Sequence, residues 1–204
     1  MSFATLDDLR SQLGESAPSA MMDEVYRAKM LHPIPEGKSV KRETFILDRV
    51  KDKTVLEFGA SGPMHDAVVK VARQVYGVDL VASQGVVACD LDDVTLALPS
   101  PPGAPDLILC GEVIEHLANP GWFLQRLRAA YQGVPILVTV PNAYCDAGRQ
   151  HLKRGMENVN RDHVAWYSPK TLSVLLARYG FPVIEFAWYN GTPPYAEGLL
   201  VVTE

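Results

Sequence analysis

The chain has 204 residues, of which 48% are hydrophobic and 21% charged, and its formal net charge at pH 7 is −5. A chain of this length suits one domain with a sizeable core, and the acidic balance argues against a wholly basic nucleic-acid-binding surface. The three cysteines (Cys89, Cys110 and Cys145) are widely separated and form no CxxC pair. We therefore expect reduced thiols, with neither a disulfide framework nor a zinc site.

The N-terminal residues 1–16 carry acidic side chains and lack an apolar core, so they predict no signal peptide. No apolar run approaches the roughly 20 residues that are needed to cross a bilayer. We expect a soluble cytoplasmic protein with no membrane partner. The sequence gives no indication of the oligomeric state.

Residues 1–53 differ from the rest of the chain because they are helical in pattern and are broken by prolines within 32–37. After this break, Phe45, Ile46 and Val50 predict a helix that leads into the first strand. We expect 1–53 to be a helical cap or lid on the main domain, residues 54–204. Helical spacing before the break is carried by two groups, Phe3, Leu6, Leu9 and Leu13, and then Met22, Val25, Tyr26 and Met30.

From residue 54 onward, apolar strand patterns alternate with helical ones. Pro63, Asn119-Pro120 and Ser168-Pro169 each suit the start of a helix. The last two strands are close enough in sequence to form an antiparallel hairpin. The pattern predicts an α/β fold with a Rossmann-like, seven-stranded, mostly parallel sheet and helices on both faces. The predicted strands are 54–58, 76–80, 85–89, 106–110, 135–140, 183–189 and 199–203.

Small and acidic residues follow the first four strands, where ligands bind in such folds. The first strand contains Glu57 and ends in the turn Gly59-Ala60-Ser61-Gly62, which allows a ligand to approach the backbone. Asp79 lies 20 residues after Gly59 and can accept both hydroxyls of an adenosine ribose. Asp90-Leu91 follows the third strand and can flank an adenine ring, and Cys110-Gly111-Glu112 follows the fourth.

These motifs resemble those of class I S-adenosylmethionine-dependent methyltransferases. The run 55–62, Val-Leu-Glu-Phe-Gly-Ala-Ser-Gly, is similar to their first motif, 106–117 to their fourth-strand motif and 138–142 to their fifth strand. The usual Gly-x-Gly-x-Gly is here Gly59-x-Ser61-x-Pro63. The resemblance implies a methyltransferase that binds S-adenosylmethionine through Glu57, Gly59, Ala60, Ser61, Gly62, Asp79, Leu80, Asp90, Leu91, Cys110, Gly111 and Glu112.

Candidate catalytic residues follow the fourth strand. Glu112, Glu115 and His116 stand at i, i+3 and i+4 and would share one face of a helical turn. The motif is similar to the metal-binding motif of ubiquinone-pathway O-methyltransferases and small-RNA 2′-O-methyltransferases, with His163 as the remaining donor. We expect Glu115, His116 and His163 to be catalytic, and all four side chains could hold Mg²⁺ or Mn²⁺. The same motif occurs in metal-free relatives, and the incomplete ligand set favours that interpretation.

Three functions remain open, beside a fourth alternative in which the protein binds the cofactor but is catalytically inactive. The first is methyl transfer to a hydroxyl of a small molecule. The second is 2′-O-methylation of RNA, which would be favoured if the basic runs 38–42 and 149–154 converge on one rim of the pocket. The third is an NAD(P)-dependent short-chain-type oxidoreductase, although Tyr167-x-x-Lys170 is one residue shorter than the Tyr-x-x-x-Lys that those enzymes need. His65 is expected to be a solvated residue at a helix start.

Overall fold

The computed structural model of this protein describes residues 32–204. The chain divides into two units, residues 1–34 and 35–204, and the second is described here by itself. The helical patterns predicted up to Met30 lie outside the described residues, so the cap or lid expected at 1–53 stays a prediction. No helix in the range 32–204 is both long and apolar enough to cross a membrane.

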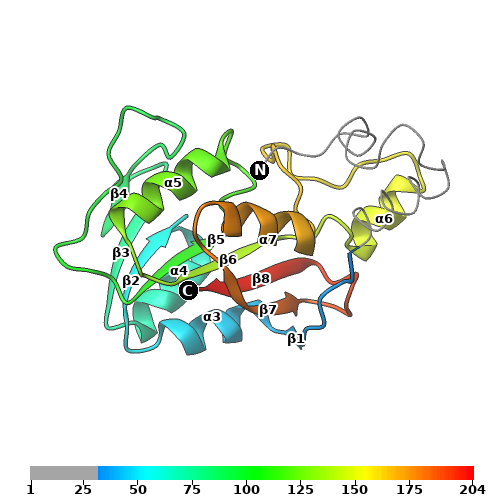
Figure 1. Cartoon of the computed structure of the whole chain (residues 1–204), viewed down its shortest axis with the longest axis horizontal. Coiled ribbons are helices and arrows are strands. Elements are labelled where there is room, and N and C mark those ends of the chain that lie inside the picture. Colours follow the sequence, from blue (N-terminus) through cyan, green and yellow to red (C-terminus); the bar gives the residue numbers. More distant parts are fainter. Residues whose placement is uncertain (1–31) are drawn as a thin grey trace, which may run out of the picture. The chain divides into compact units, whose positions relative to one another are not determined.

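The predicted α/β fold is confirmed. Within residues 32–204 one sheet of eight strands has the order β1-β7-β8-β6-β5-β2-β3-β4, parallel except where β8 pairs with β6 and β7 (Figure 1). The C-terminal hairpin is therefore antiparallel, as predicted. The strands are β1 (Ser39–Val40), β2 (Thr54–Phe58), β3 (Gln74–Asp79), β4 (Val86–Ala88), β5 (Leu107–Gly111), β6 (Ile136–Pro141), β7 (Val183–Tyr189) and β8 (Gly198–Thr203).

The predicted strand number of seven is too low by one, because β1 was missed. This strand has only two residues, in which Ser39 pairs with Trp188 and Val40 with Tyr189 of β7. Two residues cannot display a period-2 pattern, so only pairing with a distant strand identifies them.

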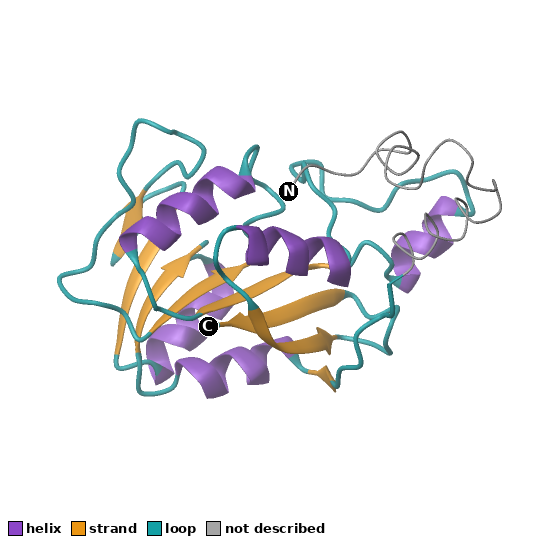
Figure 2. Ribbon diagram, in the orientation of Figure 1, coloured by secondary structure: helices purple, strands orange, loops and turns teal. Residues whose placement is uncertain are grey.

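Helices cover both faces of the sheet (Figure 2). Residues Leu56 and Ile108 face α5 and α7, whereas Val55 and Leu107 face α3 and α4. This alternation follows from the period of two in a strand, and both faces are apolar because both are covered. The helices are α3 (Arg42–Val50), α4 (Gly62–Val71), α5 (Pro120–Ala130), α6 (Asp146–Leu152) and α7 (Pro169–Arg178).

The helix starts follow the sequence signals. Asn119 accepts a hydrogen bond from the Trp122 amide at 3.0 Å and precedes α5. Ser168 forms a capping box with Thr171 at the start of α7. Each cap satisfies an amide that the first helical turn leaves without a partner.

Helix α3 belongs to the core of the sheet. Phe45, Ile46 and Val50 are buried in the same apolar cluster as Val55 and Leu107. The helix predicted from these side chains is present, and it packs on β2, which carries the first motif, and on β5. The N-terminal end of α3 thereby reaches the carboxyl end of the sheet.

Candidate active site

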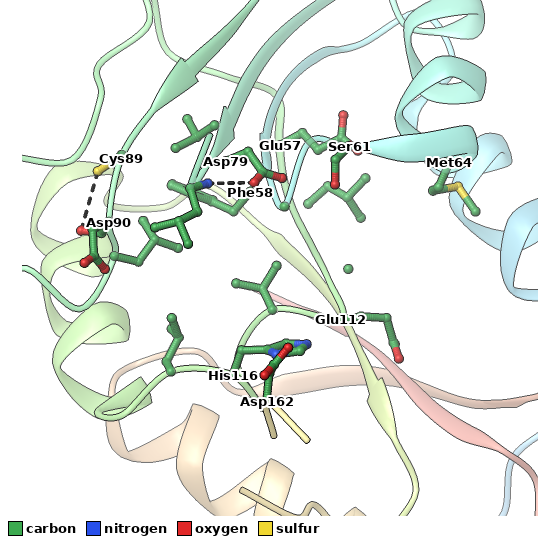
Figure 3. A pocket seen from close by; sticks show the side chains of 18 of the residues that line it. Glu57, Phe58, Ser61, Met64, Asp79, Cys89, Asp90, Glu112, His116 and Asp162 are labelled. Carbon is green, nitrogen blue, oxygen red and sulfur yellow. Dashed lines mark hydrogen bonds between the residues drawn. The ribbon is translucent and has the colours of Figure 1, made fainter. Parts of the chain in front are cut away.

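A cavity of about 650 Å³ opens at the carboxyl ends of β2, β3, β4 and β5 (Figure 3). Parallel strands bring their tips to one edge of the sheet, so residues distant in sequence meet there. The predicted cofactor residues that line the cavity are Glu57, Gly59, Ser61, Asp79, Leu80, Asp90, Leu91, Gly111 and Glu112.

Three predicted cofactor residues are not among those that line the cavity. Ala60 is 1% exposed and sits against Gly77, where an added Cβ would lie 2.9 Å from the Ala60 Cβ. Cys110 is 1% exposed, and its side chain belongs to the apolar cluster beneath α5 and α7. Gly62 begins α4. The structure therefore does not bring these three residues to the surface of the cavity.

Glu57 is a buried carboxylate at the floor of the cavity. It is 3% exposed, and its Oε2 lies 2.8 Å from Nδ1 of His65. Burial raises the pKa of Glu57, while the hydrogen bond from His65 opposes this rise. His65 is therefore not the solvated helix-end residue that was expected, because its side chain turns inward to this carboxylate.

Asp79 and Asp90 lie on the opposite side of the cavity from His116 (Figure 3). One oxygen of each carboxylate stabilises its own turn, since Asp79 Oδ1 accepts from the Leu80 amide at 2.7 Å and Asp90 Oδ1 from the Asp92 amide at 3.0 Å. The second oxygen of each carboxylate is left for a ligand. These two carboxylate oxygens can accept hydrogen bonds from hydroxyl and amino groups of a ligand.

Two glycines bring the backbone close to the cavity. Gly59 has φ +76°, and an added Cβ would lie 2.7 Å from Val113 Cγ2. At Gly111, an added Cβ would lie 2.9 Å from Arg42 Nη2. A side chain at Gly59 would thus clash within the cavity wall, whereas one at Gly111 would require the Arg42 guanidinium to move.

Arg42 also lines the cavity, although the sequence predicted no specific role for it. Its Nε donates to Thr139 Oγ1 at 3.1 Å and lies 3.8 Å from Glu112 Oε1. Glu112 Oε1 also accepts from Thr139 Oγ1 at 2.8 Å and from Tyr189 OH at 2.9 Å. Arg42 appeared in sequence only as part of the basic run 38–42, and no local pattern separates it from solvated neighbours.

Glu115, His116 and His163 form a second cluster beside the cavity. One ligand atom from each side chain lies within 4.8 Å of the others, and the rings of His116 and His163 meet edge to face with centroids 4.5 Å apart. Glu115 is 1% exposed, and among the described residues neither of its carboxylate oxygens has a hydrogen-bond partner. Asp162, which the sequence analysis did not select, lies with His116 on the same side of the cavity (Figure 3).

Glu112 does not share a face with Glu115 and His116, contrary to the expectation from helical spacing. Residues 112–118 form turns and no helix, and Glu112 has φ +57°. Its side chain therefore points to Tyr189 and Thr139 instead of to the two histidines. The predicted four-residue cluster is thus reduced to three residues.

The electrostatics of this cluster are dominated by burial. Desolvation, followed by the nearby charge of Glu112, raises the pKa of Glu115 from 4.5 to about 8. Burial and the neighbouring His116 lower the pKa of His163. A cation among these groups would favour an ionised Glu115 and neutral imidazoles.

The strand order and the cavity at the strand tips define a class I S-adenosylmethionine-dependent methyltransferase fold. A sequence profile described as a methyltransferase domain matches residues 28–185, so the chain belongs to this family and is an enzyme. This membership removes the support for the oxidoreductase alternative. No curated protein matches the sequence.

Solved structures of other methyltransferases share the fold. Small RNA methyltransferase HEN1 has a TM-score of 0.65 and 16% identity, and the match covers 85% of this chain but only 27% of HEN1. The Burkholderia thailandensis 1,6-didemethyltoxoflavin-N1-methyltransferase has a TM-score of 0.57 and 16% identity over 79% of this chain and 75% of its own. An Archaeoglobus fulgidus methyltransferase has a TM-score of 0.55 and 13% identity over 79% of this chain and 93% of its own.

Proposed function

We propose that this protein binds S-adenosylmethionine in the cavity and transfers its methyl group to a hydroxyl oxygen of a small molecule. One observation carries the proposal: acidic side chains from separate strand tips and two glycines surround a single cavity that also reaches His116. That arrangement offers donors and acceptors for a nucleoside at one side and titratable groups at the other. The cavity volume lies in the usual range for small-molecule sites.

The described residues fit the cofactor in charge as well as in space. The free oxygen of Asp79 would accept from the ribose hydroxyls, and Asp90 with Leu91 would contact the adenine. Arg42 would bind the carboxylate of the methionine part of the cofactor, because its guanidinium lies beside Gly111 at the cavity wall. When bound, S-adenosylmethionine supplies a methyl group that its sulfonium has already activated.

The task of the protein is then to align the acceptor and to exclude water. Val113 and Leu117 provide apolar lining next to His116. As the acceptor oxygen forms its bond to the methyl carbon, the C–S bond breaks and the hydroxyl proton must leave. His116 is the imidazole that lines the cavity, so we assign it the contact with this hydroxyl.

The cluster of Glu115, His116 and His163 fits a divalent cation. A buried carboxylate without a hydrogen-bond partner is costly in its charged form unless a positive charge compensates it, and one ring nitrogen from each of the two histidines lies within 4.8 Å of a Glu115 oxygen. A cation of the Mn²⁺ or Mg²⁺ type held there would lower the pKa of the acceptor hydroxyl. In a metal-free reaction, His116 itself would accept the proton, and the ring of His163 packs edge to face against it.

An RNA acceptor is the second candidate, and the likeness of the motif to that of small-RNA 2′-O-methyltransferases supports it. Of the two basic runs, however, only Arg42 lines the cavity, and Arg149 of the second run pairs with Asp146 at 3.5 Å and stacks on Tyr195. A phosphate backbone would require cations along the rim. A small acceptor therefore agrees better with the cavity.

Calorimetric titration with S-adenosylhomocysteine and, separately, NADPH tests the cofactor assignment. We expect binding of the sulfur cofactor alone, and binding of NADPH alone would overturn the proposal. The titration is repeated with Mn²⁺ and with Glu115→Gln and His163→Gln, using His151→Gln on α6 as the matched control. Loss of Mn²⁺ binding in the first two variants but not in the control supports the cation site, whereas equal binding in all of them contradicts it.

A further inference from the structure

The loop that joins β4 to β5 carries one side of the cavity. Asp90, Leu91 and Asp92 at its start line the cavity, and no helix or strand is present between residues 89 and 106. An irregular loop needs partners for its backbone groups and loses considerable conformational entropy when it becomes ordered. Two charged side chains connect this loop to the region of α5.

Arg126 of α5 binds the loop through its backbone carbonyls. Its Nη1 donates to Leu91 O and Asp93 O, both at 3.3 Å, and its Nη2 donates to Leu96 O. A guanidinium can reach several carbonyls at once because its donors form a rigid planar fork. One side chain thus fixes the curvature of residues 91–96 against α5.

Asp92 makes the reciprocal connection from the loop. Its carboxylate oxygens accept from the Ala118 amide at 3.0 Å and the Asn119 amide at 3.3 Å. These amides end the segment that carries Glu115 and His116. The Glu115 carbonyl in turn accepts from the Val164 amide at 2.9 Å, next to His163.

These hydrogen bonds, together with the chain between Glu115 and Asn119, therefore connect the nucleoside side of the cavity to the side with the two histidines. We propose that Asp92 and Arg126 are positioning residues that hold the 90–96 loop and the 115–119 segment in one arrangement before the cofactor binds. The inference rests on the proposed function, since it assigns the loop to the nucleoside part of S-adenosylmethionine. Pre-ordering of the loop raises affinity because the ligand need not order it.

The test measures S-adenosylhomocysteine affinity by calorimetry in Arg126→Met and Asp92→Asn. We expect binding to weaken about tenfold or more in each, because Arg126→Met removes all three hydrogen bonds of the guanidinium and Asp92→Asn removes the negative charge from the acceptor of the other two. Arg128→Met is the matched control, because Arg128 is on the same helix but contacts Phe181. Arg126→Lys keeps the charge and the aliphatic stem, and we expect it to restore part of the affinity.

Hydrogen exchange adds a readout that a general loss of stability would not produce. Arg126→Met should lower amide protection in 90–96, and Asp92→Asn should lower it in 115–119, while β6 keeps its protection in both. Saturation with S-adenosylhomocysteine should restore protection of both segments. If Arg126→Met does not fold, Arg126→Lys and Asp92→Asn decide the question by the same measurements.

The outcomes separate this inference from the proposed function. If the wild-type protein does not bind S-adenosylhomocysteine, the proposed function fails first. If the wild type binds it and the folded variants bind it equally well, or if Arg128→Met weakens binding as much as Arg126→Met, the positioning role is overturned and the proposed function stands.

Discussion

Glu115 should make the metal-free protein less stable as the pH rises. Its carboxyl group has a pKa of about 8 in the folded protein against an ordinary value of 4.5, because burial disfavours the anion. Since the folded pKa is raised, the stabilising contribution is complete below pH 4.5 and is lost as the pH rises through about 8. The difference corresponds to an upper bound of about 4 kcal/mol in unfolding free energy between about pH 5 and about pH 8.

The substitution Glu115→Gln tests this magnitude, because the amide keeps the shape of the side chain and does not titrate. Urea denaturation in the presence of a chelator, followed by tryptophan fluorescence, gives the free energy of unfolding at both pH values. We expect the wild-type protein to lose stability from the lower to the higher pH and the variant to lose clearly less. An identical pH dependence in the two proteins would refute the reasoning.

Addition of Mn²⁺ at the higher pH should stabilise the wild-type protein more than the Glu115→Gln variant. If the cation binds Glu115 together with the two histidines, it should raise the stability of the wild-type protein and have little effect on the variant. Equal stabilisation of both proteins would mean that the cation binds elsewhere. The pH experiment measures the cost of burying the Glu115 carboxylate, and the Mn²⁺ experiment tests whether this carboxylate binds a cation.

Three further substitutions test the cofactor side of the cavity. Asp79→Ala should weaken S-adenosylhomocysteine binding in calorimetry by about 1–3 kcal/mol, because the ribose hydroxyls lose their acceptor; unchanged affinity would show that the ribose lies elsewhere. Gly59→Ala should lower the unfolding free energy by about 1–3 kcal/mol in urea denaturation, since φ is +76° and the new Cβ would lie 2.7 Å from Val113 Cγ2. Arg42→Met should weaken binding of S-adenosylmethionine but leave binding of its decarboxylated analogue unchanged. An equal loss of affinity for both ligands would show that Arg42 does not bind the carboxylate.

The sequence determined the main features of the fold because they depend on local patterns. The strand periods, the Asn119 and Ser168 caps and the short final connection predicted seven strands and an antiparallel hairpin, all of which the structure contains. The positions of Asp79 and Asp90 at the carboxyl ends of strands also predicted one cavity. In a parallel sheet the carboxyl ends of the strands meet at one edge, so the order of residues along the chain is enough to bring these together.

Only the tertiary structure decided which side chains point at one another across that edge. Arg42 reaches Glu112 from α3, and His65 turns inward to Glu57, although neither contact has a sequence pattern. Spacing alone also placed Glu112 with Glu115, because it assumed a helical turn where the backbone enters the left-handed region at Glu112. Such choices depend on the packing of distant elements and on single backbone torsions, which no local periodicity records.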